Sequence, residues 1–293
     1  MDETVGFTDR YVRAGGLRVH VLEGGAGPPL LLIHGLGGPL MWQRVLGPLS
    51  KRFRVMAVDL PGFGESDPVS WNPAERDPMG RDASFNGYGE FLFEVTEHME
   101  VRNAIVCGIS WGGQLAVQLA DLHPDRVEKL ILICTTGLRC HPLARNSLVR
   151  IILPPMLENT VLRSRFLIDY FSRRSFYNIE NRPPDLCTQF QKGLRREGRS
   201  GAFLAALLDA AAGDPGFLER LSRLRIPSLI IWGKNDLIAP TEDAYRIGGA
   251  IPNAIVRIFP ECGHSIPLEK PRELVDAFFV FKGQEGLPHG VNS

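Results

Sequence analysis

The sequence predicts an α/β fold with a mostly parallel, doubly wound sheet, and three observations lead to this prediction. Short apolar runs typical of buried strands alternate with amphipathic segments typical of helices. Several of these runs are apolar throughout, such as residues 30–33 and 104–107, as expected for strands covered on both faces. Polar residues suited to catalysis follow the ends of three of the runs, and that edge is where open parallel sheets bind ligands.

The elements follow in chain order. The first two strands flank the glycine turn at residues 14–16 and predict a hairpin. Strands are expected at residues 7–13, 17–23, 30–33, 55–58, 104–107, 127–134, 228–232 and 254–258. Helices are expected at residues 41–50, 85–99 and 114–120, and a last one begins at Pro271, whose ring suits the first turn.

The strand–helix alternation breaks after residue 136. Helix-like pieces follow at residues 143–153, 161–170, 184–195 and 202–212, punctuated by proline pairs. We therefore expect a core made of residues 1–136 and 214–293, with a helical cap at residues 137–213. Between Gly137 and Ser200 there are eleven Arg and one Lys against five acidic residues. This excess of positive charge fits either a solvated face or attraction of an acidic substrate or a negatively charged particle surface.

Composition excludes several classes of protein. The chain has 293 residues and a formal net charge of zero, which gives no overall attraction to nucleic acid. No apolar stretch reaches the ~20 residues of a bilayer span, so no integral membrane segment is expected. The five cysteines lack metal-ligand spacing, so no metal site is expected. Residues 1–4 are acidic and resemble no signal peptide, which predicts a soluble, cytoplasmic protein.

The run Gly108-Ile109-Ser110-Trp111-Gly112 joins the strand at residues 104–107 to a helix. Strand, G-x-S-x-G and helix together are typical of a nucleophile elbow. The turn is so tight that it strains the serine backbone, and the two glycines leave room for it. Ser110 is therefore a candidate nucleophile; the alternative is an ordinary strand-to-helix turn.

A second glycine-rich stretch, residues 34–38, directly follows the strand at residues 30–33. It predicts half of an oxyanion hole, with the Leu36 amide as one donor and the Trp111 amide, just after the nucleophile, as the other. The alternative is a flexible glycine loop. His34 is expected to make structural hydrogen bonds, and Asp59 to fix the turn that follows the strand at residues 55–58.

Ser110, Asp236 and His264 occur in this order, each just past the end of a predicted strand. The order serine, acid, histidine is typical of one family, the α/β-hydrolase fold, which this chain resembles closely. The resemblance covers residues 17–136 and 214–281 and rests on the runs Leu32-Ile33-His34-Gly35, Asp59-Leu60-Pro61-Gly62-Phe63-Gly64-Glu65-Ser66, Trp232-Gly233-Lys234-Asn235-Asp236 and Gly263-His264, together with the elbow. It implies an eight-stranded sheet with a helical cap inserted after the sixth strand.

The resemblance also implies roles. Ser110 would be the nucleophile, His264 the general base and then acid, and Asp236 the group that orients the imidazole. Epoxide hydrolases and haloalkane dehalogenases of this fold use Asp where this chain has Ser110. Proline iminopeptidases have a different oxyanion stretch from residues 34–38. The carbon–carbon bond hydrolases usually carry Trp after the catalytic histidine, where this chain has Ser265.

These features predict a carboxylic-ester hydrolase that works through an acyl-enzyme, without metal or organic cofactor. Residues 108–116 resemble the elbow of intracellular hydroxyalkanoate polyester depolymerases, so the ester is either a small molecule or a polyester. One alternative is hydrolysis of a carbon–carbon, thioester or amide bond, or acyl transfer, by the same triad. The other is a non-catalytic ligand receptor on this fold. The sequence does not indicate the oligomeric state.

Overall fold

The computed structural model describes residues 6–68, 87–145 and 164–283. These residues form an eight-stranded sheet with the strand order β1-β2-β4-β3-β5-β6-β7-β8. β1 pairs with β2, and β2 with β4, in antiparallel fashion, and all the other neighbours are parallel. The predicted mostly parallel sheet is therefore confirmed.

The strands lie close to their predicted positions. Their bounds are β1 Phe7–Ala14, β2 Leu17–Gly24, β3 Pro29–Ile33, β4 Arg54–Val58, β5 Ala104–Ile109, β6 Val127–Ile133, β7 Ser228–Gly233 and β8 Ile255–Phe259. Every residue of β5 and β7 is buried. This explains the unbroken apolar runs in the sequence, since helices cover both faces of these central strands.

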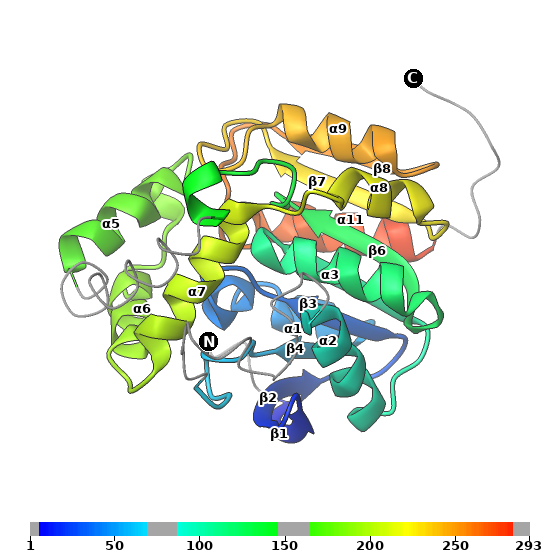
Figure 1. The fold of residues 1–293 in the computed structure, drawn as a ribbon, viewed down its shortest axis with the longest axis horizontal. Coiled ribbons are helices and arrows are strands. Elements are labelled where there is room, and N and C mark those ends of the chain that lie inside the picture. The colour runs from blue at the N-terminus through cyan, green and yellow to red at the C-terminus, as the bar shows by residue number, and fades with distance from the viewer. Residues whose placement is uncertain (1–5, 69–86, 146–163, 284–293) are drawn as a thin grey trace.

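Helices cover the sheet on two sides (Figure 1). α2 (Gly87–His98), α3 (Trp111–Leu122), α8 (Phe217–Arg223) and α9 (Glu242–Ala250) contact one another in succession and form one layer. α1 (Leu46–Ser50) and α11 (Pro271–Lys282) lie on the other side. There Phe279 of α11 stacks on Phe53, which follows α1, with ring centroids 5.9 Å apart. The buried core lies between these layers and the sheet.

The chain between β6 and β7 forms a separate group of helices beside one end of the sheet (Figure 1). Its main members are α5 (Arg165–Arg174), α6 (Leu186–Leu194) and α7 (Arg199–Ala212). The short 3-10 turn η3 (Pro142–Arg145) precedes α5 in the chain, and η4 (Ile179–Asn181) lies between α5 and α6. This position, after the sixth strand, is where the resemblance placed a cap.

No single described helix is long and apolar enough to cross a membrane. α7 and α8, which meet at an angle of 78°, meet that length and composition criterion only when they are taken together.

Some predicted helices are wrong. Residues 41–50 form two short pieces, the 3-10 turn η1 (Pro39–Trp42) and α1. Pro48 explains the break, because proline is tolerated only in the first turn of a helix, so α1 cannot begin much before residue 46. Most of the helix expected at residues 143–153 lies outside the described residues. α8, α9, the short α10 (Ile266–Glu269) and the 3-10 turn η2 (Pro124–Arg126) were not predicted.

Candidate active site

Ser110 lies between β5 and α3 in a backbone conformation that side-chain-bearing residues rarely adopt. Its φ is 56° and its ψ is −123°. Such strain persists only where surrounding contacts enforce it. The Ser110 N–H donates to the carbonyl of Ile133 on β6 at 2.8 Å, and the Ser110 carbonyl accepts from the amides of Gly113 and Thr136 at 3.0 and 3.2 Å. β6 thus anchors the turn that the sequence predicted.

Glycines are required around Ser110 because the backbone approaches itself closely. A Cβ on Gly108 would lie 2.2 Å from the Gly112 carbonyl oxygen, and one on Gly112 would lie 2.3 Å from that of Ile33. A Cβ on Gly35 would lie 2.8 Å from Ser110 Cβ. No side chain fits at these distances. The glycines of G-x-S-x-G and of the loop after β3 therefore bring that loop against the serine.

Asp236 follows β7 and His264 follows β8, and the two side chains are hydrogen-bonded. His264 Nδ1 lies 2.7 Å from Asp236 Oδ2. The other carboxylate oxygen, Oδ1, accepts from the amides of Ile238 and Ala239 at 2.7 and 2.9 Å. Burial by itself would raise the pKa of Asp236, but His264 and these amides outweigh it and hold that pKa below its ordinary value. The carboxylate is therefore ionised, and Nδ1 carries the proton that it accepts.

Ser110 and His264 meet in the wall of one cavity of about 370 Å³, called here the serine cavity. They come together because parallel strands place their carboxyl ends at the same edge of the sheet. No direct hydrogen bond joins Ser110 Oγ to His264 Nε2. Such nucleophile–base contacts are commonly looser without substrate, so the arrangement still permits proton transfer once a substrate is bound.

The two amides predicted to form an oxyanion hole flank Ser110 in different ways. Leu36 lines the serine cavity together with Gly35 and Gly37. Trp111 is not among the described lining residues, but its amide is the first of α3 and directly follows the serine. Within the described chain neither the Leu36 nor the Trp111 amide donates a hydrogen bond to a backbone carbonyl. Backbone N–H groups are seldom left unpaired, so two free amides beside one serine suit a developing oxyanion.

The rest of the serine cavity is apolar and comes largely from the helices between β6 and β7. Its described apolar lining residues include Met41, Leu167, Ile168, Phe171, Phe176, Leu186, Phe190, Leu194, Phe203, Leu207 and Ile238. No Lys or Arg is among the described lining residues. An apolar wall of this kind suits an uncharged hydrocarbon chain next to the serine.

The thiol of Cys134 lies close to the histidine–aspartate pair. Cys134 Sγ, an Asp236 oxygen and a His264 nitrogen all lie within 4.8 Å of one another, a spacing that a metal ion could use. Burial and the neighbouring Asp236 carboxylate raise the pKa of Cys134 well above its ordinary value. Metal coordination needs the thiolate. A protonated thiol beside an ionised carboxylate is better explained as packing around Asp236.

His34 and Asp59 have the structural roles that the sequence predicted. His34 Nδ1 lies 2.7 Å from the Gly35 carbonyl, and the Leu60 amide donates to Nε2 at 3.0 Å. Asp59 accepts from the Glu65 amide at 2.8 Å and so closes the turn after β4. The sequence did not predict that His20 on β2 lies 2.7 Å from the Asp59 carboxylate. β2 is far from β4 in sequence, so no local pattern could reveal this pair.

Sequence reasoning also missed Glu269, a buried carboxylate next to the histidine loop. One of its oxygens accepts from the amide of Gly263, directly before His264, at 2.8 Å. The other accepts from the amides of Tyr177 and Asn178, in the segment between β6 and β7, at 2.8 and 3.1 Å. Burial raises the pKa of Glu269 despite these amides, which act to lower it. Glu269 thus connects the helices over the cavity to the loop that carries His264.

Replacing Glu269 with Gln is expected to lower both stability and turnover. The side-chain amide presents N–H groups where one carboxylate oxygen accepted, which leaves buried backbone donors unpaired at about 1–3 kcal/mol of unfolding free energy. A displaced His264 should lower kcat for an ester by about tenfold or more. Chemical denaturation and steady-state kinetics check both, with Glu273→Gln on the exposed side of α11 as the control. Lower stability with an unchanged kcat would contradict a positioning role.

The chain is similar to known hydrolases over most of its length. The chain is 26% identical over 288 residues to the 2-hydroxy-6-oxo-6-(2'-aminophenyl)hexa-2,4-dienoic acid hydrolase of Metapseudomonas resinovorans, covering 94% of this chain and 91% of that protein. It is 28% identical over 264 residues to the pimeloyl-[acyl-carrier protein] methyl ester esterase of Nitrosomonas europaea, covering 89% and 98%.

Among solved structures, a bacterial membrane phospholipase A described as a virulence factor superposes with a TM-score of 0.76 at 26% identity, covering 96% of this chain and 87% of that chain. The sequence profile of the family described as "alpha/beta hydrolase fold" matches residues 28–271. That span runs from just before β3 into the first residue of α11 and includes Ser110, Asp236 and His264. The chain therefore belongs to the alpha/beta hydrolase fold family.

Proposed function

We propose that this hydrolase cleaves carboxylic esters through an acyl-enzyme on Ser110. The observation that carries the proposal is the shared cavity, which is lined both by a serine held in a strained turn and by a histidine that is hydrogen-bonded to a buried, ionised aspartate. A serine hydroxyl is a weak nucleophile until a base removes its proton. His264, with its Nδ1 proton bound to Asp236, presents an Nε2 lone pair for that purpose.

In the proposed reaction, Ser110 Oγ attacks the ester carbonyl while His264 Nε2 takes the hydroxyl proton. The Leu36 and Trp111 amides donate to the carbonyl oxygen as it becomes negative. His264 then protonates the leaving alkoxide, and the alcohol departs. A water molecule deprotonated by His264 attacks the acyl-enzyme in the second half of the reaction, and Ser110 recovers its proton.

We propose that residues 1–136 and 214–293 form the catalytic core and residues 137–213 a helical cap over it. Residues of this segment such as Leu167, Phe176 and Phe190 line the serine cavity together with Ser110. A cap that excludes water strengthens the electrostatic interactions inside the site. A cavity of about 370 Å³ holds one short or medium acyl chain, which fits a small-molecule ester or the end of a polyester chain.

A second candidate is carbon–carbon bond hydrolysis by the same triad, because one of the relatives is named as a dienoic acid hydrolase. Such an acid contains no ester bond, so its hydrolysis must break a carbon–carbon bond. The described lining residues of the serine cavity include no Lys or Arg, so a carboxylate would have no partner next to Ser110 itself. The apolar wall therefore favours an uncharged group, such as an ester, beside the serine.

A substrate panel separates these reactions. Purified protein is assayed with p-nitrophenyl esters of increasing chain length, a thioester, an anilide and a 2-hydroxy-6-oxo-dienoic acid. We expect the esters to give the highest kcat/KM, with an optimum at the chain length that fills the serine cavity. A higher kcat/KM for the dienoic acid than for every ester would reject ester hydrolysis as the function while leaving the serine nucleophile in place.

A further inference from the structure

A second cavity, of about 420 Å³, adjoins the serine cavity. The two share four lining residues, Gly37, Phe190, Leu194 and Phe203. Phe190 and Phe203 meet edge to face with ring centroids 5.5 Å apart and stand between the cavities. A substrate chain that passes these two rings would extend from Ser110 into the second cavity.

The second cavity has charged walls, unlike the serine cavity, and is called here the charged cavity. It is enclosed by the loop after β3, the turn after β4, and α6 with the start of α7. Its ionisable lining residues are His20, Asp59, Glu65, Lys192, Arg196 and Arg199. A charged compartment that continues an apolar one suits a substrate with a polar group at its far end.

The acidic groups of the charged cavity are already neutralised. Arg196 donates to both Glu65 oxygens, at 2.7 and 3.1 Å, and to the Gly64 carbonyl at 3.0 Å. Asp59 is hydrogen-bonded to His20 Nδ1 at 2.7 Å. Burial by itself would lower the pKa of His20, but Asp59 and Asp9 outweigh it and raise that pKa, so the imidazole is readily charged. Among the described lining residues, Arg199 and Lys192 are then the cations that form no ion pair with a described carboxylate.

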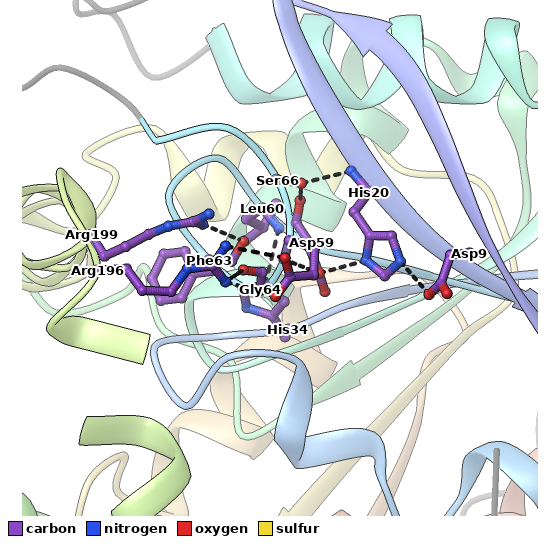
Figure 2. A network of polar contacts seen from close by, with 11 residues as sticks. Asp9, His20, His34, Asp59, Leu60, Phe63, Gly64, Ser66, Arg196 and Arg199 are labelled. Atoms are coloured by element: carbon purple, nitrogen blue, oxygen red, sulfur yellow. Dashed lines mark hydrogen bonds and ion pairs between the residues drawn. The ribbon is translucent and has the colours of Figure 1, made fainter. Parts of the chain in front are cut away.

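Arg199 is unusual for a buried cation. It is 6% exposed, and in the described chain its guanidinium makes a single hydrogen bond, from Nη1 to the Phe63 carbonyl at 2.8 Å. No carboxylate of the described residues lies within ion-pairing distance of it, although Arg196 beside it has Glu65. Figure 2 shows Arg199, the first residue of α7, and Arg196, three residues before it, both reaching toward the turn at Phe63 and Gly64.

A guanidinium has five N–H donors, and a buried charge without a counter-ion is costly. Burial lowers the pKa of Arg199 and repulsion from Arg196 adds to the effect, while attraction to the carboxylates of Glu65, Asp59 and Asp67 offsets only part of it. The remaining donors of Arg199 are therefore available to an acceptor that enters the charged cavity. Because Asp59 and Glu65 also line the cavity, an acceptor with one negative charge fits better than a group with two.

We propose that the charged cavity binds a carboxylate at the far end of the acyl chain, with Arg199 as its main ligand, so that the substrates are half-esters of dicarboxylic acids. This inference rests on the proposed ester hydrolysis at Ser110. The ester group occupies the serine cavity, the methylene chain passes Phe190 and Phe203, and the carboxylate reaches the guanidinium. Arg199 thereby selects substrates by charge and chain length.

The test compares monomethyl esters of dicarboxylic acids with methyl esters of monocarboxylic acids of equal length, measured as kcat/KM. In the wild-type protein the ratio of half-ester to neutral ester should peak at one chain length. Arg199→Met should lower that ratio by about 10–100-fold, because charge-assisted hydrogen bonds to the carboxylate are lost. It should leave the neutral esters nearly unchanged. Arg195→Met, an exposed arginine that lines neither cavity, is the matched control and should keep the wild-type ratio.

Three results would overturn the assignment. The wild-type protein could hydrolyse neutral esters and show no preference for half-esters at any length, a result that needs no variant to fold. Arg199→Met could lower both substrate series equally, as expected if Arg199 only attaches α7 to the turn at Phe63. Arg195→Met could lower the ratio as much as Arg199→Met. By contrast, absence of any ester hydrolysis in the wild-type protein would count against the proposed function itself.

Discussion

Replacing Ser110 with Ala is expected to lower kcat for the best p-nitrophenyl ester by about five to six orders of magnitude. The proposed nucleophile has no substitute, because no other described hydroxyl lies in the strained turn against the loop after β3. Binding should survive, since the apolar wall of the serine cavity is untouched and Ser110 contributes little of its surface. Steady-state kinetics with the wild-type and variant proteins, purified apart to avoid carry-over, measures the loss.

Ser175→Ala is the matched control for this prediction. Ser175 lines the same cavity, and its hydroxyl donates only to the Phe171 carbonyl of its own helix at 3.1 Å. We expect it to keep kcat within a few-fold of the wild-type value. Circular dichroism should show both variants folded. Ester turnover by Ser110→Ala within tenfold of the wild-type protein would contradict the nucleophile assignment.

Replacing Asp236 with Asn is expected to lower kcat by about 10⁴-fold without disturbing the fold. The structure explains the direction of the change. Oδ1 of residue 236 must go on accepting from the amides of Ile238 and Ala239, so the Asn carbonyl should occupy that side. The Asn N–H₂ then faces His264 Nδ1 and donates to it. The imidazole proton must move to Nε2, where it cannot accept the serine proton.

The tautomer of His264 provides an independent measurement of this prediction. Nitrogen chemical shifts of His264 should report a protonated Nδ1 in the wild-type protein and a protonated Nε2 in Asp236→Asn. The loss in kcat should accompany that exchange. If the variant shows the exchanged tautomer but retains at least a tenth of the wild-type kcat, His264 is not the general base.

The parts of this molecule that sequence predicts well are those that depend on neighbouring residues. The strand bounds follow from continuous apolar runs, and the turn at Ser110 follows from glycines two residues before and after it. Asp236 and His264 were predictable for the same reason, because each directly follows a strand of a parallel sheet. Such a sheet places the ends of β5, β7 and β8 on one edge.

The parts that sequence did not predict depend on partners distant in the chain. Glu269 acts through amides at residues 177 and 178, and no local pattern distinguishes it from an exposed glutamate near the start of a helix. His20 is paired with Asp59, although their strands, β2 and β4, are not consecutive in the chain. From the sequence alone, a polar residue on β2 would be assigned to the exposed face of the strand. Arg199 seemed to be one of many charges on an arginine-rich segment, and only its burial separates it from Arg195.

The aromatic residues of the segment between β6 and β7 also show that a sequence pattern does not reveal which side chains are covered by other elements. Packing of these side chains against the core is the natural interpretation of their apolar character, and Phe176 is indeed buried. Phe166 is 77% exposed, however, and Tyr170 and Tyr177 are about half exposed. Helix α5, which carries two of them, has no buried residue. Periodicity indicates which residues share a helix face, but it does not indicate whether another element covers that face.

Covalent labelling is the most direct test of whether Ser110 is a nucleophile activated by a base. The wild-type protein is incubated with a fluorophosphonate, which phosphonylates serines activated by a base, and the modified peptide is identified by mass spectrometry. We expect one adduct per chain, on Ser110, with labelling lost in Ser110→Ala and strongly slowed in Asp236→Asn. An adduct on another residue, or an unmodified Ser110 in folded protein, would contradict the role of Ser110 as nucleophile and favour a ligand receptor on this fold.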